Sequence, residues 1–124
     1  MIAADTSSMI AFLQDQEGRD TQAISDALRN DSLHLPPVVV TELLSDPKAS
    51  GQVRQVIGQL PLLSLSEGFW LRAAQSRQKL LQRGYKARLG DALVAQACVD
   101  NDIPLIARDT DFRHFVNLCG LRLA

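Results

Sequence analysis

The sequence has few of the residues on which several large classes of enzyme depend. Cys98 and Cys119 are the only cysteines, and they lack the paired spacing of a zinc site or a disulfide framework. Both stand among apolar residues, which predicts buried thiols in a reducing compartment. The two histidines, His34 and His114, have no cysteine or acid at a catalytic spacing. We therefore expect ordinary surface or core histidines and no nucleophile that depends on them.

An excess of charge and long apolar runs are lacking as well. The chain has 13 basic and 14 acidic residues, and its net charge of −1 gives no general attraction to nucleic acid or to an anionic membrane. No run approaches the roughly 18 apolar residues of a membrane span. The first eight residues lack the basic start of a signal peptide. We expect one cytoplasmic domain over residues 1–124, without a membrane partner.

Short apolar runs alternate with amphipathic segments along the chain. This spacing predicts strands over residues 1–4, 33–35, 62–65, 103–107 and within 118–123. It predicts helices from Asp5 and over residues 20–30, 51–60, 67–83 and 92–99, and a segment 38–44 that starts β-like and turns helical. The expected core stripe of the longest helix is Trp70, Ala73, Ala74, Leu80 and Leu81. Strands that alternate with helices favour a three-layer α/β/α fold around a small, mainly parallel sheet.

Acidic residues stand where these elements meet. Asp5 follows the first strand, and Asp109 and Asp111 follow the late apolar strand. Open α/β sheets bind ligands outside the carboxyl ends of their strands, so these acids can share a pocket with Glu42 and Asp91, each near the start of a helix. Each acid also has an ordinary alternative: a helix cap for Asp5 or Asp91, a first-turn position for Glu42, and a turn for the last pair.

Glu42 and Asp91 lie in strongly apolar surroundings. Aliphatic residues flank Glu42 within residues 38–44, and residues 92–99 draw Asp91 to the edge of the core. A carboxylate there needs a partner, because an unpaired buried charge is costly. Clustered carboxylates without matching Arg or Lys predict a hard divalent cation, Mg²⁺ or Mn²⁺. Such an ion can activate water and stabilise a displacement at phosphorus.

Four short motifs resemble the acidic motifs of PIN-domain nucleases. They are AADTS around Asp5, VTELL around Glu42, GDALVA around Asp91 and ARDTDF around Asp109. In order, spacing and length the chain is similar to the VapC-type toxins of bacterial toxin–antitoxin systems. The resemblance implies a Mg²⁺- or Mn²⁺-dependent endoribonuclease, often dimeric, which a small antitoxin protein neutralises. It also implies that these four acids are catalytic.

The resemblance extends to the residues around the acids. The metal ligands that it implies are Asp5, Asp91, Asp109 and Asp111. Two roles stay open for Asp111. It can be a metal ligand, for a second metal or through a water molecule, or it can cap the next turn. Thr6 and Ser7 resemble the small hydroxyl residues beside the first acid of the family, where they support it. Ala107 stands where the family often has Thr, so one supporting contact is in question.

Basic residues are concentrated between positions 72 and 88. They are Arg72, Arg77, Lys79, Arg83, Lys86 and Arg88. A solvated helix face explains them as well as a rim that contacts phosphates does. The candidates for RNA contacts are Arg83, Lys86, Arg88 and, in the last motif, Arg108.

Two further interpretations stay open beside the toxin. One is a PIN nuclease of RNA processing, and the other is a catalytically silent module whose acids bind a partner's arginine or a structural cation. The segments that form a dimer interface and an antitoxin groove in PIN toxins correspond here to regions with several apolar side chains, which core packing explains equally well. They are Phe12, Leu13, Val53, Val56 and Ile57.

Overall fold

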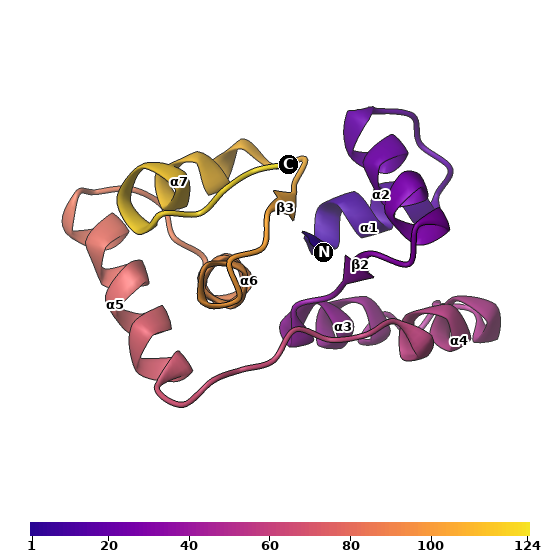
Figure 1. The fold of residues 1–124 in the computed structure, drawn as a ribbon, viewed down its shortest axis with the longest axis horizontal. Coiled ribbons are helices and arrows are strands. Elements are labelled where there is room, and N and C mark those ends of the chain that lie inside the picture. The colour runs from indigo at the N-terminus through magenta and orange to yellow at the C-terminus, as the bar shows by residue number, and fades with distance from the viewer.

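A three-stranded parallel sheet lies at the centre of the computed structural model, which describes residues 1–124 (Figure 1). The central strand is β1 (Ile2–Ala4), between β2 (Leu33–His34) and β3 (Leu105–Ile106). Ala3 is paired with a residue of each neighbouring strand, so both edges of β1 are hydrogen-bonded. The carboxyl ends of all three strands therefore point the same way.

Seven α-helices flank this sheet and complete the expected three-layer α/β/α fold. Helices α1 and α2 pack together on one side, and α5, α6 and α7 pack together on the other, while α3 contacts both α1 and α6. None of them combines the length and the apolar character needed to cross a membrane. Their bounds are α1 (Thr6–Leu13), α2 (Arg19–Arg29), α3 (Pro37–Leu44), α4 (Gly51–Gln59), α5 (Phe69–Gln82), α6 (Leu89–Asp100) and α7 (Arg113–Cys119).

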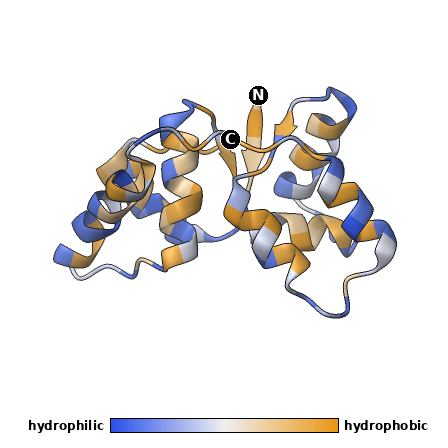
Figure 2. Cartoon of the chain, turned by 90° about the horizontal axis from the view of Figure 1, so that it is seen from below, coloured by the Kyte–Doolittle hydropathy of each residue, from blue (hydrophilic) through white to orange (hydrophobic).

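The core lies between the layers and includes the strands themselves. β1 and β3 are covered on both faces, as the uninterrupted apolar run 103–107 predicts for a parallel sheet. Helix α6 buries six of its residues on nearly all sides, which confirms the prediction for residues 92–99. Figure 2 shows the central strands in the hydrophobic colour, with hydrophilic residues on the outer turns and loops.

The two strands predicted over residues 62–65 and within 118–123 are each reduced to a single β-bridge. Leu62 pairs with Leu35, and Leu123 pairs with Leu105, both in parallel. The prediction of a strand within 118–123 is wrong at its start, because helix α7 runs to Cys119. Gly120, with φ 79°, then ends the helix in the left-handed conformation that glycine favours.

Segment 38–44 has no β-like start, because α3 is helical from Pro37. Proline is well suited to the first helical turn, where its fixed φ is helical and its missing N–H leaves no bond unmade. The β-branched valines that favoured a strand are accommodated by packing, with Val39 fully buried. Tertiary burial here outweighs a weak local preference.

The predicted core stripe of α5 is wrong in part. Ala73 and Leu80 are buried, and Phe69 joins them, but Trp70, Ala74 and Leu81 are exposed. A helix rotates by about 100° per residue, so an error of one position moves a side chain from the core to the surface. The exposed ring of Trp70 remains available for contacts outside this chain.

Candidate metal centre

The central strand pairing brings the first and the last acidic motif side by side. The backbone N–H of Asp5 donates to the Ile106 carbonyl at 3.0 Å, directly beyond the β1–β3 ladder. Asp109 follows three residues later, after the end of β3. Asp5 and Asp109 therefore lie at the carboxyl edge of the sheet, where the sequence predicts the site.

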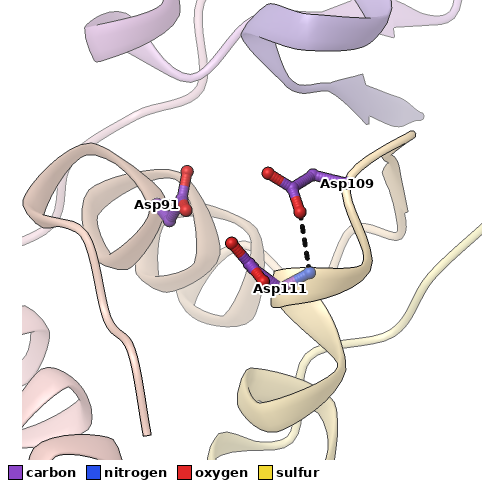
Figure 3. A group of neighbouring side chains, drawn as sticks. All are labelled: Asp91, Asp109 and Asp111. Carbon is purple, nitrogen blue, oxygen red and sulfur yellow. Dashed lines mark hydrogen bonds between the residues drawn. The ribbon is translucent and has the colours of Figure 1, made fainter.

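A short 3₁₀ turn, η1 (Thr110–Phe112), sets the directions of the two acids of the last motif. One Asp109 oxygen accepts the Asp111 N–H at 2.8 Å, so Asp109 caps the turn (Figure 3). Phe112 is 1% exposed and anchors the turn in the core. The cap is thus Asp109, and the Asp111 carboxylate is left to face its neighbours.

Three carboxylates converge at this point, from Asp91 in the first turn of α6 and from Asp109 and Asp111 (Figure 3). One oxygen of each lies within 4.8 Å of the others. Lys86 Nζ lies 3.9 Å from Asp111 Oδ2, but both side chains of this pair are partly exposed. A distant, solvated ammonium neutralises such a cluster only weakly.

The electrostatics of the cluster favour uptake of positive charge. Burial, followed by the charge of Asp109, raises the pKa of Asp91 to about 6. Arg88 acts in the opposite direction, and the charges of Asp5 and Asp111 raise the pKa further. A proton or a cation at this point therefore relieves repulsion among the carboxylates.

Asp5 is the most enclosed acid of the site, at 4% exposure. It caps α1, because Oδ1 accepts the Ser8 N–H at 2.9 Å, while the Ser7 hydroxyl donates to Oδ2 at 2.9 Å. Burial raises the pKa of Asp5 above its ordinary value in spite of these hydrogen bonds, and the charge of Asp109 adds to the increase. Asp5 is therefore both a helix cap and part of the acidic site.

Glu42 reaches the same edge from α3, but it is not one of the three converging carboxylates. The Thr6 hydroxyl donates to Glu42 Oε1 at 2.7 Å. A Cβ on Gly90, the residue before Asp91, would lie 3.4 Å from Glu42 Oε2. The Glu42 carboxylate therefore lies beside the start of α6, within ordinary contact distance of position 90. Thr6 and Ser7 each support one acid.

The donor set fits a divalent cation of the Mg²⁺ or Mn²⁺ type. Its atoms are carboxylate oxygens, and no thiol or imidazole belongs to the converging group. Of the four predicted ligands, Asp91, Asp109 and Asp111 come close enough to share one ion. Asp5 lies at the same edge of the sheet, where its backbone N–H donates to the Ile106 carbonyl, and its charge contributes to the raised pKa of Asp91.

The basic residues near the site divide into two groups. Arg72 binds Asp100, with Nη2 to Oδ2 at 2.8 Å, and the Arg77 Nε–H donates to the Ala87 carbonyl at 2.8 Å. Both tie α5 to α6 or to the chain that enters it. The RNA-contact candidates that stay exposed along this segment are Arg83, Lys86 and Arg88.

Arg108, the fourth RNA-contact candidate, binds the start of α2 and the loop before it. Its guanidinium donates to both Asp20 oxygens, at 2.8 and 3.0 Å, and to Gln16 Oε1 at 2.8 Å. The hydrogen bond from Arg108 lowers the pKa of Asp20 to about 2. The two residues are 88 positions apart, so no periodicity in the sequence could have revealed this clamp.

Comparisons with known proteins identify a family and similar folds. The PIN domain family model matches residues 2–118. One similar solved structure is VapBC2 from Rickettsia felis bound to a promoter DNA fragment, with a TM-score of 0.75 and 17% identity, covering 100% of this chain and 98% of that chain. VapBC-5 from Mycobacterium tuberculosis has a TM-score of 0.70 and 19% identity, covering 98% of this chain and 95% of that chain. FitAcB from Neisseria gonorrhoeae has a TM-score of 0.71 and 20% identity, covering 99% of this chain and 96% of that chain. No curated protein is significantly similar to the chain in sequence.

Proposed function

The chain belongs to the PIN domain family, and on that basis we propose that it is a Mg²⁺- or Mn²⁺-dependent endoribonuclease that acts as the cytoplasmic toxin of a toxin–antitoxin pair. The observation that carries the proposal is the convergence of three carboxylates from α6 and η1, with Asp5 and Glu42 beside them. A turn or a set of caps would not require acids from four separate motifs at one edge of a sheet.

Asp91, Asp109 and Asp111 would hold the cation. When bound, the ion supplies positive charge that stabilises the phosphate in the transition state and lowers the pKa of a nearby water. Ser7 and the Ser8 N–H fix Asp5 so that its carboxylate adds negative charge to the same pocket.

Glu42 is suited to receive a proton. Its Oε1 accepts a hydrogen bond from the Thr6 hydroxyl, while Oε2, the oxygen nearer to Gly90, accepts no hydrogen bond from the chain. Oε2 can therefore accept a proton from a water that attacks the phosphorus. The more exposed position of Glu42, at the edge of the cluster, is consistent with contact to solvent.

The exposed basic residues at positions 83, 86 and 88 lie on the segment that leads into α6, and the last two of them are near the acids. Lys86 is close to Asp111, and Arg88 affects the pKa of Asp91, so this segment reaches the cluster directly. Phosphate contacts from these side chains would position the RNA backbone over the carboxylates without reading its sequence.

A hollow between α1, α3 and α4 is the proposed place for the antitoxin. It has a volume of about 310 Å³, its apolar lining includes Leu13 and Val53, and Glu42 forms part of its wall. A partner chain seated there would cover Glu42 and stop cleavage. VapBC-5, to which the chain is similar in fold, is a member of the VapBC family of toxin–antitoxin systems.

We further propose that the chain forms a homodimer through the outer face of α5. Trp70 is 65% exposed and Leu71 is 72% exposed, and large exposed apolar side chains of this kind commonly mark interfaces. Ile57, one of the residues considered for such a surface, is instead 1% exposed and belongs to the core.

Cleavage of structured RNAs tests the proposed activity. We expect cleavage by the native chain with Mg²⁺ or Mn²⁺, none in EDTA, and a loss of at least about tenfold in Asp91→Asn and Asp109→Asn. Asp31→Asn is the matched control, because Asp31 is exposed and asparagine tolerates its positive φ of 52°. Equal activity in all four proteins would refute the proposed site. Growth arrest on expression, lost in the same variants, would distinguish a toxin from a nuclease of RNA processing.

A further inference from the structure

Tyr85 and His114 form a stacked aromatic pair that the proposed mechanism does not use. Their ring centroids are 3.8 Å apart and their planes differ by 8°. Tyr85 lies in the loop between α5 and α6, and His114 lies in the first turn of α7. The stack therefore joins two segments that both lead to the acidic cluster.

Two relationships place this pair at the edge of the metal centre. His114 follows Asp111 by three positions in a continuous helical segment, η1 and α7, so both side chains project from the same side of it. Lys86, the residue after Tyr85, reaches Asp111 with Nζ 3.9 Å from Oδ2. Both rings therefore lie near Asp111: His114 is on the same helical segment, and Tyr85 precedes Lys86, which contacts Asp111.

The pair has the properties of a surface on which a nucleobase stacks. Tyr85 remains 39% exposed although its ring lies against His114, and the stack restricts the ring to one orientation. Unpaired bases of RNA are commonly held by stacking on aromatic side chains, with basic residues on the adjoining phosphates. Exposed basic residues flank the pair on both segments: Arg83, Lys86 and Arg113.

We propose that Tyr85 and His114 form a subsite for one unpaired nucleobase of the RNA, next to the phosphate that faces the carboxylates. This inference rests on the proposed ribonuclease function, because it names the part of the substrate that lies beside the site. A base held there fixes which phosphate reaches Asp91, Asp109 and Asp111. The subsite would therefore direct cleavage to single-stranded positions and influence which position is cut.

The test measures binding of a short single-stranded RNA with Ca²⁺ in place of Mg²⁺, so that the result does not depend on cleavage. Tyr85→Leu removes the aromatic ring but keeps an apolar side chain, and Tyr85→Phe keeps the ring. We expect about tenfold weaker binding for Tyr85→Leu and native binding for Tyr85→Phe. Native affinity in a Tyr85→Leu protein with an unchanged melting temperature would overturn the subsite.

A second measurement identifies the base and does not depend on how well the variants fold. The RNA is replaced by versions in which one position at a time lacks its base. Removal of the base at one position should weaken binding to the native chain about tenfold, and should not weaken binding to Tyr85→Leu any further. No other position should behave in this way. Tyr85 is the only tyrosine, so all ring signals of labelled tyrosine come from this residue, and they should move upfield on addition of the intact RNA.

The outcomes separate this subsite from the proposed function. Coupling between Tyr85 and one base without any Mg²⁺- or Mn²⁺-dependent cleavage would leave the subsite standing and refute the nuclease. If the chain cleaves RNA, but removal of each base has the same effect on binding to the native chain and to Tyr85→Leu, the subsite is refuted and the nuclease stands. Absence of RNA binding would refute both.

Discussion

Removal of one charge from the carboxylate cluster should stabilise the metal-free protein. Asp91→Asn keeps the size of the side chain and removes its charge. In the native chain, burial and the charge of Asp109 raise the pKa of Asp91 from 3.8 to about 6. Near neutral pH the folded state therefore holds an ionised carboxylate in surroundings that disfavour it.

The sign and size of the effect follow from linkage between protonation and folding. Between about pH 4 and pH 6 the folded chain binds more protons at Asp91 than the unfolded chain, so stability falls as the pH rises through this range. The gap from 3.8 to about 6, at about 1.36 kcal/mol per pH unit, gives an upper value of about 3 kcal/mol. Because Asp91 is only half-buried and water screens its charge, we expect about 1–2 kcal/mol.

The assay compares the urea unfolding of native and Asp91→Asn protein in EDTA at pH 4 and pH 7.5. The variant should be the more stable by about 1–2 kcal/mol at pH 7.5, or roughly 3–8 °C in melting temperature. At pH 4, close to the unfolded pKa of 3.8, the difference should shrink to about 0.5 kcal/mol or less. Addition of Mn²⁺ or Mg²⁺ should reverse the order, because the native chain gains binding energy and the variant has lost a ligand.

The exposed Asp31→Asn variant is the control and should follow the native protein under every condition. A variant less stable than the native chain at pH 7.5 in EDTA would show that Asp91 is held by favourable contacts and not by repulsion. Equal stabilisation of both proteins by the cation would show that Asp91 is no ligand.

Three other changes test separate parts of the site. Thr6→Val removes the 2.7 Å hydrogen bond to Glu42, and we expect about tenfold slower RNA cleavage with an unchanged melting temperature; a native rate would show that Glu42 needs no support. Arg108→Gln releases the chain that leads into the last motif, so cation binding measured by titration calorimetry should weaken about tenfold, whereas native affinity would limit the clamp to a structural role. Reversal of Arg83 and Arg88 to Glu should weaken RNA binding and flatten its dependence on salt; an unchanged slope would identify a solvated helix face.

Local signals in the sequence determined the fold and the neighbourhood of the site. The uninterrupted apolar run before Asp109 specifies a strand covered on both faces, and the residues after Asp91 specify a helix buried nearly all round. Parallel strands share a carboxyl edge, so acids at strand ends and helix starts had to come near one another. For these features the order and spacing of residue types are sufficient.

Only the tertiary structure decided which acid caps the 3₁₀ turn, which acid faces the cluster, and which partners the other side chains contact. Asp109 caps the 3₁₀ turn and Asp111 faces Asp91, a choice that depends on the direction in which Phe112 anchors the turn. The partner of Arg108 and the stacking of Tyr85 on His114 join segments distant in the chain. Spacing along a chain records local periodicity, whereas these contacts depend on how separate elements pack, and no local pattern contains that information.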